Sequence, residues 1–155
     1  MQPPKGFRLM GQTVKVYFRL VQDEDGYPPV AVESVWAQPT TRASEFVLDN
    51  LPFFAREATL GDTVLVREED GHLWFEQVVH RSRNSLVRVV FFDRACVERV
   101  NNQLVALGCS TEYIKAHNLL AASIPENVNL RDVQDYLQAE ASEGAIDYEE
   151  PILRQ

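Results

Sequence analysis

The sequence predicts an α+β protein in which a small all-β part precedes a ferredoxin-like part. Residues 13–81 contain five short strand-like runs and no helical pattern. Two amphipathic helical stripes appear only in the second half of the chain, where the element order is β-α-β-β-α-β. We therefore expect an all-β subdomain at residues 1–82 and a ferredoxin-like subdomain at residues 83–155. No Pro/Gly/Ser-rich linker separates them, so we expect the two to pack as one compact unit.

The first subdomain is expected to be a small, bent antiparallel β-sheet or barrel. Its strands are indicated by β-branched and aromatic residues and by alternating polarity, at residues 13–21, 30–37, 45–51, 63–68 and 72–81. Asp70–Gly71 between the last two runs is a strong hairpin signal. In the strand that follows, alternation places four residues on one side: Leu73, Phe75, Gln77 and Val79.

The second subdomain begins with an apolar strand at residues 85–92. Asp93 is a suitable cap for a helix whose apolar stripe is Val97, Val100, Leu104 and Leu107, with Gly108 at its end. Asn129 caps a second helix, which faces inward with Leu130, Val133, Leu137 and Ala141 and ends at Gly144. The remaining strands are expected at residues 111–115, 119–124 and 145–149. If residues 111–115 form a loop instead, the unit is β-α-β-α-β.

The chain carries a net charge of −8, and the two subdomains contribute equally to it. Nucleic-acid binding depends on a basic face that neutralises phosphates, so we expect no nucleic-acid partner. No apolar run approaches the roughly 20 residues that span a bilayer, and the N-terminal residues do not resemble a secretory signal. We therefore expect a cytoplasmic protein with no membrane association.

The sequence contains no convincing cofactor, metal or catalytic motif. Its cysteines, Cys96 and Cys109, are not clustered with other zinc ligands, and we expect both to be small buried residues. Cys109 and His117 could be imagined as a nucleophile and base, but Cys109 carries no activating basic cluster. We therefore expect no cofactor, no metal and no catalytic residues.

The stretch VQDEDGYPPVAVESVW, from Val21 to Trp36, has the most unusual composition. If Gly26 were the sixth residue of a calcium loop, valines would occupy the first and twelfth positions, where oxygen ligands are required. A glycosidase-like carboxylate pair has no support beyond the abundance of acids. The simpler interpretation is a glycine–proline turn whose acids are solvated.

Two further stretches allow both a structural and a functional interpretation. In DNLPFFAREATLGD (residues 49–62), the adjacent phenylalanines could plug the end of the sheet or form an aromatic–arginine contact patch. The acidic segment EASEGAIDYEE (residues 140–150) could be a solvated edge or an acidic face for a basic partner.

Over roughly residues 14–150 the chain resembles the bacterial domain-of-unknown-function family 4265. The resemblance rests on DEDGYPPVAVESVWA, LDNLPFFAREATLGDTV, LWFEQVVHRSRNSLVRVVFF and LGCS. It implies no catalytic mechanism, but it draws attention to the residues that match the hallmark positions: Asp25, Gly26, Pro28, Pro29, Glu33, Pro52, Phe53, Phe54, Ala55, Gly61 and Asp62.

We expect a non-catalytic protein-binding module, most concretely an immunity protein that occludes a bacterial toxin or effector domain with a basic surface. The expected contact residues are Asp23, Asp25, Tyr27, Glu33, Trp36, Phe54, Arg56, Asp147 and Glu149. Two alternatives remain. One is a small-molecule-sensing regulatory domain, and the other is an enzyme of undescribed type.

Overall fold

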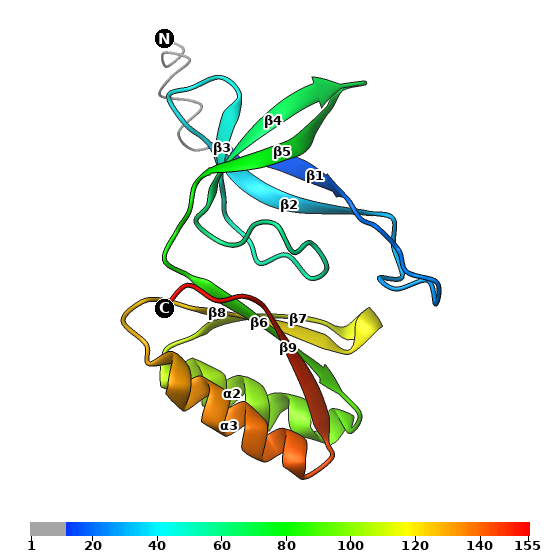
Figure 1. Cartoon of the computed structure of the whole chain (residues 1–155), viewed down its shortest axis with the longest axis vertical. Coiled ribbons are helices and arrows are strands. Elements are labelled where there is room, and N and C mark those ends of the chain that lie inside the picture. The colour runs from blue at the N-terminus through cyan, green and yellow to red at the C-terminus, as the bar shows by residue number, and fades with distance from the viewer. Residues whose placement is uncertain (1–11) are drawn as a thin grey trace. The chain divides into compact units, whose positions relative to one another are not determined.

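The structure, a computed structural model, describes residues 12–155. The chain divides into two compact units, of which the first ends at Ser82 and the second begins at Arg83. Each unit has its own hydrophobic core. The first is a β-barrel and the second is an α+β sandwich, so the α+β class predicted from the sequence is confirmed (Figure 1). In the described residues, no helix is both long enough and apolar enough to cross a membrane.

The first unit is a closed five-stranded barrel with the order β1-β2-β3-β4-β5. Its strands are β1 (Val14–Arg19), β2 (Val32–Pro39), β3 (Glu45–Leu48), β4 (Thr63–Glu69) and β5 (His72–His80). Consecutive strands pair antiparallel, and the barrel closes where β1 pairs parallel to β5. This closing contact pairs Val16 with Leu73 and Tyr17 with Trp74.

Alternation along β1 and β2 explains the barrel core. Val16 and Phe18 of β1 and Val35 and Ala37 of β2 are buried inside, and the residues between them point outward. Because Glu33 shares the parity of Val35, its side chain also starts from the inner side of β2.

The strand β5 departs from simple alternation. The sequence placed Gln77 and Val79 on the same side as Phe75, but in the structure Val78 packs against the core and Gln77 is exposed. Leu65 pairs with Gln77 and the next residue of β4 pairs with Phe75, so Glu76 is an extra residue that forms a bulge. The bulge reverses the alternation, which no local pattern in the sequence reveals.

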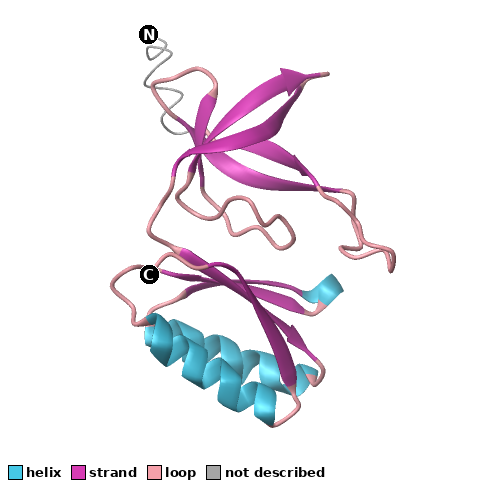
Figure 2. Cartoon of the chain, viewed as in Figure 1, coloured by secondary structure: helices cyan, strands magenta, loops and turns pink. Residues whose placement is uncertain are grey.

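The second unit is a four-stranded antiparallel sheet with the order β7-β8-β6-β9. Its elements are β6 (Ser85–Phe91), the short helix η1 (Arg94–Cys96), α2 (Val97–Leu107), β7 (Ser110–Ile114), the short helix η2 (Lys115–His117), β8 (Leu119–Ile124), α3 (Leu130–Ser142) and β9 (Ile146–Ile152). Helices α2 and α3 cover one face of the sheet (Figure 2). The connectivity is the ferredoxin-like plan, and β7 is a strand rather than a loop.

Local signals account for the helix boundaries in this unit. Asn129 accepts a hydrogen bond from the N–H of Arg131 and caps α3 as predicted. Asp93 accepts one from the N–H of Ala95, but it caps the short helix η1, whereas the N-cap of α2 is Cys96, whose side chain makes no capping bond. Helix α2 ends at Gly108, whose φ of +108° lies in the left-handed region that favours glycine.

Candidate protein-binding surface

The connection between β1 and β2, residues 20–31, is an ordered acidic loop. Asp23 organises it, because its Oδ1 accepts hydrogen bonds from the N–H groups of Asp25 and Tyr27, both at 2.9 Å. The N–H of Asp23 in turn donates to the carbonyl of Tyr27 at 2.7 Å. This arrangement is an Asx-type turn, so the loop has a defined shape before any partner arrives. The carboxylates of Glu24 and Asp25 lie at its exposed tip.

Exposed apolar side chains are concentrated on the same hairpin. Seven large hydrophobic residues are exposed in the part of the chain that the structure describes, and four of them lie on the hairpin. These are Val21, Tyr27, Val32 and Trp36, which are 93%, 49%, 43% and 44% exposed. A grouping of exposed apolar residues beside charges is typical of an interaction surface, whereas single exposed residues are not informative.

Glu33 holds the neighbouring loop in place. Its Oε2 accepts the N–H of Phe53 at 2.5 Å, and its Oε1 accepts those of Phe54 and Ala55 at 3.0 and 2.8 Å. Three successive backbone donors therefore surround one carboxylate, an arrangement known from anion-binding nests. We call this arrangement the Glu33 clamp. Glu33 was predicted as a partner contact, but both of its carboxylate oxygens are engaged within the barrel unit.

A second carboxylate fixes the other end of the same loop. Asp62 is fully buried, its Oδ2 accepts the N–H of Thr59 at 2.9 Å, and its Oδ1 accepts that of Ser82 at 2.8 Å. The hydroxyl of Ser82 donates to the carbonyl of Leu60 at 2.8 Å. The irregular segment at residues 49–62 is thus fastened at both ends by a carboxylate that accepts backbone N–H groups.

The remaining predicted residues of the first unit lie in different environments. Phe54 is only 9% exposed, and its ring packs edge-on against Tyr27 with the centroids 6.2 Å apart. It therefore supports Tyr27 instead of offering a free surface. Arg56 is exposed next to it, and Trp36 is exposed on β2 beneath the ammonium of Lys15, 5.0 Å from the ring centroid.

The predicted acids of the C-terminal segment lie on β9 in the second unit. Asp147 is exposed and accepts the N–H of Tyr148 at 2.9 Å. Glu149 forms an ion pair with the buried Arg88 at 3.3 Å. Because removing Glu149 would leave the Arg88 charge without this partner, the carboxylate has an internal structural task.

The outside of the barrel carries an aromatic and cationic surface that was not predicted from the sequence. Lys15, Tyr17 and Arg19 alternate outward along β1, and register places Lys15 opposite Trp36 of β2 and Tyr17 opposite Trp74 of β5. The Arg19 guanidinium lies 3.7 Å from the centroid of the Trp74 ring. We call these five residues the aromatic face. The spacing along β1 was visible in the sequence, but the parallel pairing with β5 was not.

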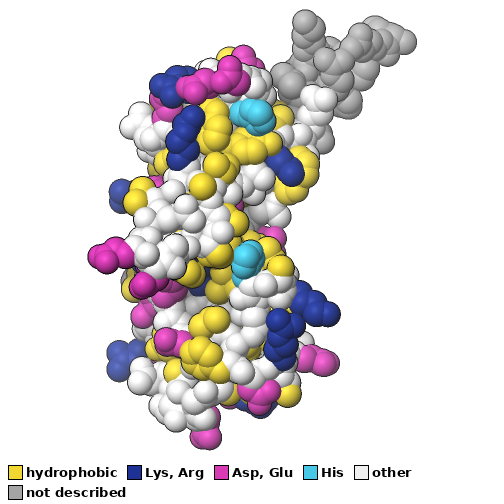
Figure 3. Space-filling view, turned by 90° about the vertical axis from the view of Figure 1, so that its right-hand side faces the viewer, with side chains coloured by type: hydrophobic (Ala, Val, Ile, Leu, Met, Phe, Trp, Pro, Cys, Tyr) yellow, Lys and Arg dark blue, Asp and Glu magenta, His cyan; other side chains and the backbone are white. Residues whose placement is uncertain are grey.

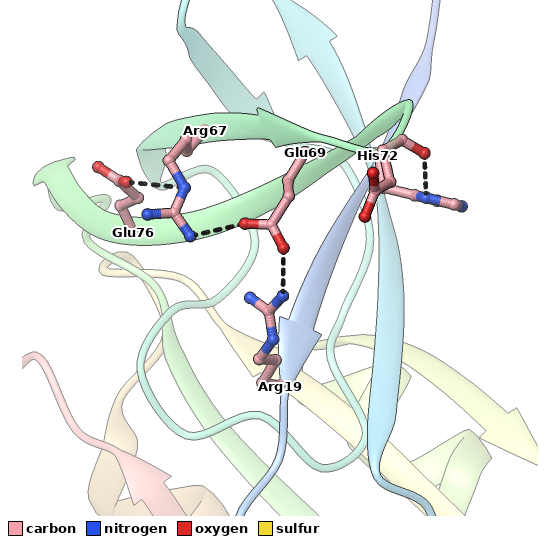
Figure 4. A network of polar contacts seen from close by, with 6 residues as sticks. Arg19, Arg67, Glu69, His72 and Glu76 are labelled. Carbon is pink, nitrogen blue, oxygen red and sulfur yellow. Dashed lines mark hydrogen bonds and ion pairs between the residues drawn. The ribbon is translucent and has the colours of Figure 1, made fainter.

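An ion-pair network borders the aromatic face (Figure 4). Glu69 contacts Arg19 at 3.4 Å and Arg67 at 3.0 Å, and Arg67 approaches Glu76 at 3.8 Å. All four side chains are about half exposed, so each pair contributes little to stability.

Both cysteines are buried and free, as predicted, and they line the core of the second unit. Burial raises the pKa of the Cys109 thiol to about 11, so at neutral pH it remains protonated and weakly nucleophilic. Between residues 12 and 155, no group of three or more His, Cys, Asp or Glu side chains is arranged to hold a metal ion.

Comparison with protein families identifies residues 33–148 as a domain of unknown function (DUF4265). The chain belongs to the DUF4265 family. The Glu33 clamp joins two of the stretches by which the chain resembles this family. One stretch supplies the Glu33 carboxylate, and the other, at Pro52–Ala55, supplies the backbone N–H groups that it accepts. Both sides of the clamp therefore lie within the matched residues 33–148.

Among solved structures, the chain is similar to a hypothetical protein from Neisseria gonorrhoeae. The sequence identity is 17% and the TM-score is 0.74, with 93% of this chain and 97% of that chain covered. At this identity the similarity shows a shared fold. No curated protein matches the chain.

Proposed function

We propose that this DUF4265 protein is a protein-binding module that acts without catalysis, and that it is an immunity protein which neutralises a bacterial toxin by covering its basic substrate cleft. The proposal is supported above all by the hairpin surface, where exposed Tyr27 and Val21 flank the acidic tip of residues 23–25. Binding hot spots are enriched in tyrosine, tryptophan and arginine, and Tyr27 is an exposed anchor of this kind.

The loop carboxylates and apolar side chains would have different tasks in such a complex. Glu24 and Asp25 attract a basic cleft and accelerate the encounter, because complementary charges mainly raise the association rate. Tyr27 provides the buried anchor, and its contact with Phe54 fixes the ring in advance. A ring that is already ordered loses less conformational entropy when it binds.

The acidic loop is the better candidate for this role than the acidic segment of β9. Glu24 and Asp25 project from a turn, whereas Glu149 is committed to its ion pair with Arg88. The Glu33 clamp contributes indirectly, because it fastens the segment that carries Phe54 beneath Tyr27.

Co-expression with the product of an adjacent toxin-domain gene tests the proposal. We expect the two proteins to co-purify and the host cells to be protected from growth arrest. Expression of the toxin domain with Glu24→Lys/Asp25→Lys should restore growth arrest, because the reversed charges repel a basic cleft.

The matched control is Asp135→Lys/Glu143→Lys, which reverses two exposed carboxylates on and just after α3 and leaves the hairpin intact. It should protect as well as the unmodified protein. If the unmodified chain neither binds the neighbouring product nor protects the cells, the proposal fails. Stabilisation by a metabolite in a thermal-shift screen would instead favour the small-molecule-sensing alternative.

A further inference from the structure

The β1–β2 hairpin carries two surfaces of opposite character. One is the acidic loop, with Glu24 and Asp25 at its tip. The other is the aromatic face, which places Lys15 and Arg19 beside two tryptophans and a tyrosine. On one side of the barrel unit, hydrophobic side chains are visible next to basic side chains and a histidine (Figure 3).

The aromatic face is locally basic in a chain whose net charge is −8. Its cations are Lys15 and Arg19, together with Arg67 at its border, and they outnumber the neighbouring carboxylates of Glu69 and Glu76. Lys15 and Arg19 therefore attract an acidic and partly apolar partner to this face.

We propose that a second copy of this chain occupies the aromatic face, with the acidic loop of each copy lying on the aromatic face of the other. The two surfaces fit each other chemically. Carboxylates of Glu24 and Asp25 meet Lys15, and Val21 packs beside the exposed indole of Trp36. Four of the seven large exposed hydrophobic residues in the described part of the chain lie on this hairpin, and the association covers them.

The separation of the two surfaces along the hairpin favours association between copies. The Lys15–Trp36 pair lies four residues from the Arg19–Val32 pair, where the loop begins. At the rise of a β-strand this is about 13 Å, so the loop tip does not fold back onto Lys15 of its own copy. A twofold axis perpendicular to the strands makes the two hairpins run in opposite directions, which brings each loop over the far end of the other hairpin.

The existing contacts on the aromatic face do not prevent this association. Lys15 lies over Trp36 and Arg19 contacts Glu69 at 3.4 Å, and these side chains are exposed. Exposed pairs of this kind are weak and exchange partners readily. The contact is charged and limited in area, so we expect a reversible dimer with a dissociation constant on the order of micromolar, weakened by salt.

This inference concerns self-association and does not depend on the proposed function. It has one consequence for that function, because both associations use the acidic loop. A partner that covers Glu24 and Asp25 excludes the second copy, so the complex contains one copy of this chain for each partner molecule.

Sedimentation velocity of the full chain over a range of about 1–100 µM tests the inference. We expect a monomer–dimer equilibrium that shifts towards the monomer at high salt. Tryptophan emission provides a second readout, since both tryptophans of the chain, Trp36 and Trp74, belong to the aromatic face. It should shift to shorter wavelength as the concentration rises and Trp36 is covered. A monomer at every concentration overturns the inference.

Charge reversal identifies the surfaces involved. Lys15→Glu and, separately, Glu24→Lys/Asp25→Lys should each weaken the homodimer at least tenfold, because like charges then face each other. An equimolar mixture of the two variants should recover the dimer, since each loop then meets a face of opposite charge. Lys115→Glu, an equal charge change at an exposed site in the second unit, should leave the equilibrium unchanged.

If the mixture of the two variants does not recover the dimer, the proposed contact between the acidic loop and the aromatic face is wrong. The same conclusion follows if each variant alone dimerises as strongly as the unmodified chain. Far-ultraviolet circular dichroism establishes that each variant is folded. These measurements involve no toxin, so their outcome is separate from that of the protection assay.

Discussion

Replacement of Glu33 by alanine removes the carboxylate that accepts the N–H groups of Phe53, Phe54 and Ala55. A hydrogen bond to a charged group contributes about 1.5–3 kcal/mol, but this site is partly exposed, so water replaces some of the lost interaction. We therefore expect the barrel unit to lose about 2–4 kcal/mol of unfolding free energy. Glu33→Gln should lose less, about 1–2 kcal/mol, because one oxygen remains and the amide group opposes only the N–H of Phe53.

Urea denaturation followed by tryptophan emission measures this effect in the correct unit, since Trp36 and Trp74 both lie in the barrel. The protein concentration is kept in the monomeric range for this experiment. Glu24→Gln is the matched control, because its side chain is exposed in the acidic loop and should change the stability by less than about 0.5 kcal/mol.

Equal stability of Glu33→Ala and Glu24→Gln would refute the reasoning, because the three hydrogen bonds would then contribute nothing beyond what water provides. The order of the variants matters as much as the size of the effect. If Glu33→Gln were as damaging as Glu33→Ala, the two oxygens would not act separately as the geometry requires.

Three other substitutions or modifications test the remaining structural claims. Asp62→Asn should destabilise the barrel unit by about 2–3 kcal/mol in the same urea assay, because the amide group opposes the N–H of either the buried Thr59 or Ser82. Gly108→Ala should destabilise the second unit by about 1–3 kcal/mol by circular dichroism, since φ is +108° and the new Cβ would lie 2.5 Å from Cγ2 of Val128. Cys109, with a pKa of about 11, should react with iodoacetamide at pH 8 far more slowly in the folded protein than in urea.

The strands and helices could be predicted because their signals are local. Alternating polarity located the strands, Gly108 marks the end of α2, and Asn129 marks the start of α3, while Asp93 caps the short helix η1. The parallel closure of the barrel between β1 and β5 could not be predicted in the same way, because it joins segments more than fifty residues apart. The bulge at Glu76 is also invisible locally, since it depends on pairing with β4.

The candidate surface was predicted only in part. A glycine–proline turn rich in acids indicated that Asp23 and Asp25 would be exposed, and the structure places both at the surface. The sequence could not distinguish Glu33 from those acids, because its partners are backbone N–H groups about twenty residues away. For the same reason, Trp74 was not recognised as a neighbour of Tyr17.

Calorimetric titration of the neighbouring toxin domain with this protein tests the central claim most directly. The unmodified chain should bind with a stoichiometry of one to one, and Glu24→Lys/Asp25→Lys should weaken the affinity at least a hundredfold, about 2.7 kcal/mol. The Asp135→Lys/Glu143→Lys control should bind as the unmodified chain does. Equal affinities for all three proteins would contradict the account, because the acidic loop would then not be the surface that meets the partner.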